Sequence, residues 1–353
     1  MKEMITRKII SLLMIIVIAA CAVACGAGNA PGAGSDAGIK SSTAADKKVV
    51  VVSPHPVEFM KPLLNEFETE TGITVEIIKS GTSEAVERIR DGEAIDVLWG
   101  GSVLSVGSYE DLFAEYRTVN RKAFADDFKN MPDTMTCFTD VPSVLIVNTD
   151  LVGDIEINGY EDLLNPRLNG KIAFANPARS SSSFEHLTNM LYAMGDGDPE
   201  NGWDYAEQFA SRLKGNFVGS SSEVYKGVAG GKYIVGLTFE EAAVTMLKSG
   251  KHVKIVYMEE GVVSTPDGLY INKNAPDRDN AEAFVDFMTA VDTQNFITKE
   301  LGRRSVRIDV PESELVAPKK EVNIIKVDPD RVKNNKDKWV EKFVALVEED
   351  GHE

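Results

Sequence analysis

Between residues 48 and 100, apolar and polar positions alternate between strand-like and helix-like spacing. The apolar runs with strand-like character are 48–53, 73–78 and 96–99. A helical pattern that ends at Gly72 lies between the first two runs, and another over 83–90 precedes the third. The order strand-helix-strand-helix-strand predicts a parallel sheet, so the loops after the three strands should meet at one edge.

A second α/β set begins after Pro142. Its predicted strands are 143–147, 171–174 and 234–237, and its predicted helices are 180–194, 199–213 and 240–248. A strand over 268–271 then leads into an amphipathic helix over 279–290 that is expected to return to the first set, and a last amphipathic helix spans 328–349. Roughly 300 residues follow position 46, which is too many for one hydrophobic core by the usual limit. The predicted fold class is therefore α/β with two lobes.

The first 25 residues read as an export signal. Basic residues precede an uncharged apolar run over 9–23 that ends in small residues and Cys25. The run is shorter than a membrane-spanning helix requires. Ala22-Val23-Ala24-Cys25 resembles the lipobox of bacterial lipoproteins, with Cys21 as the alternative acylation site. We therefore expect an extracytoplasmic protein with a lipid anchor in the cell membrane, tethered by a flexible linker over 26–46.

Charge and cysteine content narrow the possible partners. The formal net charge is −17, which makes a nucleic-acid partner unlikely on electrostatic grounds. The same charge disfavours attachment to anionic lipid heads, so membrane association should rest on the acyl chain. Cys137 is the one cysteine beyond the signal, so the exported part contains no internal disulfide.

Several segments together resemble bacterial ABC-transporter solute-binding proteins, in the branch of ferric-ion, sugar-phosphate and phosphonate receptors. They are the lipobox, VVVVSPHPVEFMKPLLNEFETETGITVEI, AIDVLWGGS, PSVLIVNTDL, YEDLLNPRLNGKIAFANPARSSSSFEHL and YIVGLTFEEAA. The resemblance implies a type II periplasmic-binding-protein fold with a hinge and a ligand cleft between the lobes. It also implies delivery to the permease subunits of an importer, with no reaction and no cofactor.

The same resemblance implies domain boundaries. Lobe 1 is expected to comprise 47–143 and 262–310, and lobe 2 to comprise 144–261. The remaining residues, 311–353, should supply a C-terminal helix that packs on lobe 2.

A serine run is the strongest local indication of the ligand. Arg179 and Ser180, Ser181, Ser182 and Ser183 lie between a predicted strand and a helix. A helix start offers unpaired N–H groups and a positive dipole end, and the hydroxyls add donors, which suits phosphate, phosphonate or carboxylate. The alternative is that one serine merely caps the helix. Ser221, in a second cluster over 219–222, has the same two interpretations.

Further candidates lie on the loops and on the crossing segment. Thr82 and Ser102 would add hydroxyl donors, and Ser143 begins the predicted crossing segment. Gly100 and Gly101 either donate backbone N–H groups or only relieve a tight turn. His55 follows the first strand, where it either contacts the ligand or makes an ordinary loop hydrogen bond.

Glu240 and Glu241 occupy the position where ferric-ion receptors of this branch carry adjacent tyrosines. None of the nine tyrosines adjoins another, so that phenolate pair is missing and no metal site is predicted. The two glutamates would suit sugar hydroxyls or an amine, or they form an acidic first helical turn. Arg303, Arg304 and Arg307 form a basic cluster that either complements an anion or, by default for such a run, lies on a solvated surface.

The leading hypothesis is a receptor of an ABC importer that captures a small anionic ligand, a sugar phosphate or phosphonate. Ferric iron with a synergistic anion is the alternative within the same class. An exported hydrolase or phosphatase is the alternative from another class, because an anion pocket also suits catalysis. The sequence contains no Gly-x-Ser-x-Gly elbow and no His-Glu-x-x-His motif, so we expect no enzyme.

Overall fold

The computed structural model describes residues 47–350. The predicted signal, the anchor candidates Cys21 and Cys25, and the linker lie outside the described residues. Within the described part, no helix is long and apolar enough to cross a membrane.

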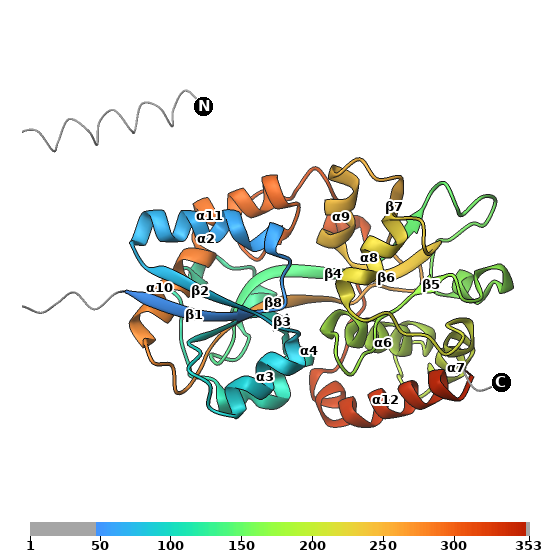
Figure 1. Ribbon diagram of the computed structural model, residues 1–353, viewed down its shortest axis with the longest axis horizontal. Coiled ribbons are helices and arrows are strands. Elements are labelled where there is room, and N and C mark those ends of the chain that lie inside the picture. Colours follow the sequence, from blue (N-terminus) through green and yellow to red (C-terminus); the bar gives the residue numbers. More distant parts are fainter. Residues whose placement is uncertain (1–46, 351–353) are drawn as a thin grey trace, which may run out of the picture. The chain divides into compact units, whose positions relative to one another are not determined.

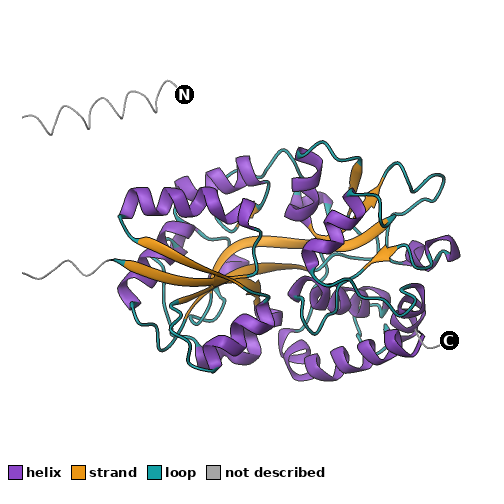
Figure 2. Ribbon diagram, viewed as in Figure 1, coloured by secondary structure: helices purple, strands orange, loops and turns teal. Residues whose placement is uncertain are grey.

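Lobe 1 is built on a mixed sheet with helices on both faces (Figures 1 and 2). Its strands are β1 (Lys48–Ser53), β2 (Thr74–Lys79), β3 (Val97–Ser102), β8 (Ser264–Ile271) and β9 (Arg304–Ser305). Its helices are α2 (Val57–Thr71), α3 (Thr82–Arg90), α4 (Val103–Val106), α5 (Asp126–Lys129), α10 (Arg278–Thr289) and α11 (Val291–Phe296), followed by a π-helical turn, η5 (Ile297–Leu301). β1 pairs in parallel with β2 and β3, which confirms the strand-helix-strand prediction.

The apolar run of β1 is buried on both faces because helices cover both. Val49 and Val51 pack with Phe59 and Phe67 of α2, whereas Val50 and Val52 pack on the other face with α3. Gly72 ends α2 in the left-handed conformation, with φ of 68°, as expected of a glycine after a helix.

One long strand, β4 (Thr136–Asn148), belongs to both lobes, and in Figure 1 it runs from one into the other. Its first half, through Pro142, pairs with β8, and its second half, from Ser143, pairs with β6 and β7. The predicted strand over 143–147 is thus half of a longer one. Proline lacks an N–H donor, so it suits the point where the strand changes partners.

Lobe 2 repeats the arrangement around the second half of β4. Its other strands are β5 (Ile172–Ala173), β6 (Val235–Phe239) and β7 (Val253–Val256). Its helices are α6 (Ser181–Met194), α7 (Trp203–Arg212), α8 (Ser221–Ala229), α9 (Glu240–Lys248) and α12 (Pro329–Asp350). Short 3₁₀ turns occur in the two lobes at Gly107–Leu112, Arg121–Ala123, Glu161–Leu164, Pro166–Leu168 and Lys319–Glu321.

The C-terminal helix packs on lobe 2. Trp339, Phe343 and Val347 of α12 are fully buried in the cluster that holds Phe174 and Phe209. Helix α7 begins four residues later than the pattern over 199–213 predicts. The chain turns first, with Asp196 and Gly197 at positive φ.

Candidate functional site

A cleft of about 1100 Å³ lies between the lobes. Its walls come from the loops after β1, β2 and β3 of lobe 1 and from the starts of α6 and α8 of lobe 2. The predicted site residues that line it are His55, Thr82, Gly101, Ser102, Ser143, Ser180, Ser181, Ser182 and Ser221. The tertiary structure thus brings together residues from both halves of the chain, and their role in ligand binding remains a prediction.

Three helix starts meet at this cleft, and we call their hydroxyl residues the hydroxyl rim. The rim comprises Thr82 and Ser83 of α3, Ser180, Ser181 and Ser182 of α6, and Ser220, Ser221 and Ser222 of α8. The N-terminal ends of these helices present N–H groups and positive dipole ends to the same space. The rim therefore favours an anion.

Part of the rim serves as helix caps. The Oγ of Ser180 accepts a hydrogen bond from the backbone N–H of Ser183 at 3.3 Å, and the Oγ of Ser220 accepts one from Glu223 at 3.3 Å. The capping interpretation thus holds for one serine of each cluster. The neighbouring serines, Ser181 and Ser221, line the cleft without capping a helix.

The rim also joins the two lobes. The Oγ1 of Thr82 donates to the Oγ of Ser181 at 3.2 Å, and the Oγ of Ser83 donates to the carbonyl of Ala178 at 3.2 Å. Lobe closure and the candidate anion site therefore involve the same helix starts.

Four basic side chains line the cleft: Lys79, Arg179, Lys226 and the buried Arg303. Arg179 and Lys226 form no ion pair within residues 47–350. The Nζ of Lys79 donates to the carbonyl of Pro54. Desolvation lowers the pKa of Lys79 to about 8, with Lys226 also lowering it and Glu58 opposing the shift. A bound anion would favour the charged form of this lysine.

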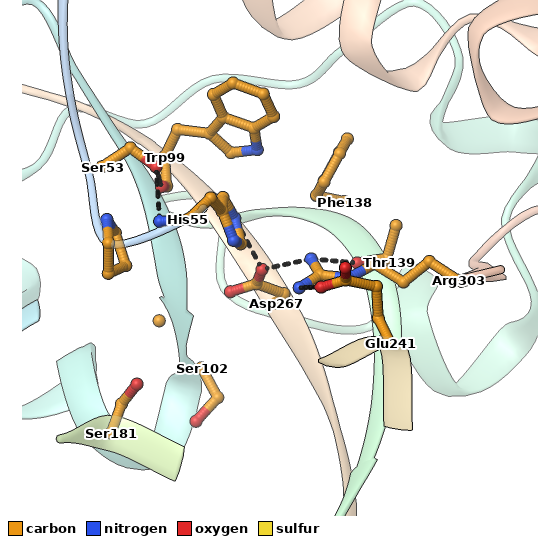
Figure 3. Close-up of polar contacts among 12 residues, drawn as sticks. Ser53, His55, Trp99, Ser102, Phe138, Thr139, Ser181, Glu241, Asp267 and Arg303 are labelled. Atoms are coloured by element: carbon orange, nitrogen blue, oxygen red, sulfur yellow. Dashed lines mark hydrogen bonds and ion pairs between the residues drawn. The ribbon is translucent and has the colours of Figure 1, made fainter. Parts of the chain in front are cut away.

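Deeper in the cleft lies a buried ionic cluster, which we define as His55, Asp267, Arg303 and Glu241 (Figure 3). The Nη1 of Arg303 donates to the Oδ2 of Asp267 at 2.8 Å and to the Oγ1 of Thr139 at 3.1 Å. The Nε2 of His55 lies 3.0 Å from the same Asp267 oxygen. Glu241 Oε2 lies 3.6 Å from Arg303 Nη2. Arg303 is 3 % exposed, which contradicts the expectation of a solvated basic surface.

Glu185 forms a second buried contact between the lobes. It lies on α6, and its two carboxylate oxygens accept hydrogen bonds of 2.6 Å from Ser102 and Thr265 of lobe 1. Burial raises the pKa of Glu185 to about 7, and the two hydroxyl donors only partly oppose that shift. Glu185 takes no part in a capping box.

Glu240 and Glu241 form the acidic first turn of α9, which is the second of the two interpretations of this pair. Glu240 lies outside the cleft lining and forms a two-pronged ion pair with Arg304, at 2.7 and 2.9 Å. Glu241 faces Arg303 instead of the main cleft. Two adjacent acids of lobe 2 thus pair with two adjacent arginines of lobe 1. Arg304 is 3 % exposed, so it too is buried rather than solvated.

Gly100 and Ser183 also lie outside the cleft lining. Gly100 has a φ of 129°, and a Cβ there would lie 2.8 Å from the ring of Pro54, so close packing requires the glycine. Ser183 is fully buried beneath the helix start. The third arginine of the predicted basic cluster, Arg307, is 8 % exposed and pairs with Asp309.

Sequence reasoning missed Asp267 and Glu185. One signal pointed to Asp267, because it directly precedes the predicted strand over 268–271 and a carboxylate at the end of a buried strand needs a partner. The sequence offered no comparable signal for Glu185, whose partners lie 80 and 83 residues away. No group of three or more His, Cys, Asp or Glu side chains within residues 47–350 is arranged to hold a metal ion.

Comparisons with known proteins agree with this architecture. A family profile described as "Bacterial extracellular solute-binding protein" matches residues 49–300. Iron uptake protein A1 of Synechocystis sp. is 23% identical over 304 residues, which cover 81% of this chain and 83% of the relative.

Two solved structures share the fold. The periplasmic binding protein AfuA of Actinobacillus pleuropneumoniae, described with exogenous fructose-6-phosphate bound, superposes with a TM-score of 0.78 at 19% identity, covering 85% of this chain and 98% of that chain. A protein described as a two-component system protein that mediates signal transduction gives a TM-score of 0.71 at 29% identity, covering 85% of this chain and 99% of that chain.

Proposed function

This chain belongs to the bacterial extracellular solute-binding proteins, and we propose that its solute is a phosphorylated small molecule, a sugar phosphate or phosphonate, delivered to an ABC importer. The family binds solutes for transport and carries out no reaction. The observation that carries the proposal is the hydroxyl rim, where α3, α6 and α8 begin at one cleft. Backbone N–H groups, hydroxyls and helix dipoles together suit a phosphoryl group.

Cations in the cleft offer partners for the same ligand class. Lys79, Arg179 and Lys226 line the cleft together with the helix starts, and Glu58, Glu84 and Glu87 line it as well. Lipid anchoring at Cys25, or at Cys21, is part of the proposal, since it would hold the receptor beside its permease.

The first test is thermal unfolding of the full-length protein, purified in detergent, with fructose 6-phosphate, 2-aminoethylphosphonate, inorganic phosphate and ferric citrate. A ligand that binds only the folded state stabilises it by about 2.7 kcal/mol at one hundred times its Kd. We expect stabilisation by a phosphorylated organic compound. The double variant Ser181→Ala/Ser182→Ala should weaken it while leaving the cap at Ser180 intact.

A matched control is Ser211→Ala on α7, whose hydroxyl bonds the carbonyl of Gln208 away from the cleft. The control should bind as tightly as the wild type. Equal binding by the double variant would contradict the role of the rim.

Ferric iron is the second candidate, and the similarity to an iron uptake protein favours it. Of the tyrosines in the described residues, only Tyr225 lines the cleft. Burial and the nearby carboxylates Glu241 and Glu58 raise its pKa, which disfavours the phenolate before a metal binds. Stabilisation by ferric citrate alone would favour this candidate.

The relative described as a two-component protein supports a second use of the same capture step. In this second candidate function, the present chain would report its captured solute to a signalling system instead of delivering it to a permease. Deletion of the gene separates the two uses, because loss of solute uptake indicates transport and loss of a solute-induced transcript indicates signalling.

A further inference from the structure

Asp267 presents one free carboxylate oxygen to the cleft. It lies on β8, is 7 % exposed and lines the cleft. Arg303 and His55 both contact its Oδ2, at 2.8 and 3.0 Å. Oδ1 has no partner among residues 47–350, and Figure 3 shows it pointing away from Arg303.

The neighbours of Asp267 hold it in the ionised form. Burial alone would raise the pKa of Asp267, but His55 and Arg303 outweigh burial and lower the pKa to about 2. An ionised carboxylate only accepts hydrogen bonds. Oδ1 is not among the fully buried atoms of the described residues, so it is open to the cleft, where a donor on a ligand can take the place of water.

Glu185, the other buried carboxylate that lines the cleft, has no comparable free oxygen for a ligand. Both oxygens of Glu185 already accept short hydrogen bonds, from Ser102 and Thr265. Asp267 is therefore the buried acid of the described cleft whose second oxygen remains available to a ligand.

We propose that Asp267 determines ligand specificity by accepting a hydrogen bond from a hydroxyl or amine of the solute, at a position removed from its phosphoryl group. The inference rests on the proposed function, since the hydroxyl rim must hold the phosphoryl group. The ligand class is then a phosphate or phosphonate ester whose remaining part bears hydrogen-bond donors. A second anionic group beside Asp267 would be repelled, because two like charges would share a site largely shielded from water.

Calorimetric titration of the full-length protein tests this inference with two probes. Fructose 6-phosphate carries hydroxyls beyond its phosphate, whereas 6-phosphogluconate carries an additional carboxylate. A hydrogen bond to a charged group contributes enough to predict a preference of about 10- to 100-fold for fructose 6-phosphate. In Asp267→Asn we expect weaker binding of fructose 6-phosphate and a preference reduced at least several-fold.

Asp140→Asn is the matched control. Asp140 is a buried acid on the adjacent strand β4, paired with Lys319 and Ser264, and it does not line the cleft. Its variant should keep both the affinity and the preference of the wild type.

The possible failures are distinguishable. If the wild-type protein binds no phosphorylated compound, the proposed function fails and the inference fails with it. If the wild-type protein binds both probes equally well, the proposed function stands and the specificity role of Asp267 is overturned. This outcome needs only the wild-type protein, so it holds even if Asp267→Asn does not fold. A variant that folds and keeps the full preference would also overturn it.

Discussion

The hydroxyl rim lines the cleft, as do His55, Asp267 and Arg303 of the buried ionic cluster, but the two regions are constructed differently. The rim consists of helix starts, in which each cap is made within three residues, as between Ser180 and Ser183. The ionic cluster joins four segments that are distant in the chain, and its charges are almost entirely removed from water.

This difference predicts how each region tolerates substitution. A cap contributes locally, and water replaces part of a lost hydroxyl because the rim borders solvent. A member of the ionic cluster cannot be removed alone, since its partners would remain charged and buried. We therefore expect modest effects at the rim and large effects in the cluster.

The largest effect should follow Arg303→Met. The change leaves Asp267 and Glu241 without their shared cation, and breaking a buried pair from one side typically costs about 3–5 kcal/mol. Urea unfolding measures this loss. The control Arg167→Met removes an exposed pair with Asp154 and should leave the free energy of unfolding unchanged. Equal stability of the two variants would contradict the contrast between regions.

The next effect concerns Glu185→Gln and depends on pH. The folded-state pKa of Glu185 is raised to about 7, so its contribution to stability is fully present below the unfolded value of 4.5 and is lost as pH rises through 7. Relative to wild type, Glu185→Gln should gain roughly 3 kcal/mol on going from pH 4 to pH 8.

Thermal unfolding of both proteins across this pH range measures the difference. Asp267 and Lys336, the charged groups nearest Glu185, are present in both proteins, so the comparison isolates the carboxyl group. A pH-independent difference would show that Glu185 has an ordinary pKa in the folded state.

The smallest effect should follow Ser180→Ala. Loss of its cap to Ser183 should cost about 1 kcal/mol of stability. Ser220→Ala removes the equivalent bond to Glu223 and should cost a similar amount. Chemical unfolding of the two variants tests whether their losses in free energy of unfolding are similar. If either loss were as large as that of Arg303→Met, the contribution of these serines would not be limited to a local helix cap.

Much of the fold could be predicted because its signals are local. The apolar run of β1, the helical spacing up to Gly72 and the stripe of α12 all depend on residues close in sequence. The strand over 136–148 was predicted only in part. Pro142 reads as a boundary locally, whereas in the structure it marks a change of partner strands.

The site divides in the same way. The serine clusters are visible in the sequence because a helix start and its hydroxyl donors are contiguous. By contrast, Glu240 and Glu241 were interpreted as ligand-binding residues or as an acidic helical turn, and Arg303 and Arg304 were expected on a solvated surface. Nothing in the sequence indicated that the two glutamates pair with the two arginines, which lie more than 60 residues away along the chain.

The sequence by itself therefore determined the α/β elements, the two-lobed class and the helix starts that favour an anion, since hydrophobic periodicity and capping act over one or two turns. The tertiary structure alone decided which charges are buried together and which oxygen of Asp267 stays free. Those properties depend on distances between segments and on exclusion of water, and only the folded chain sets either.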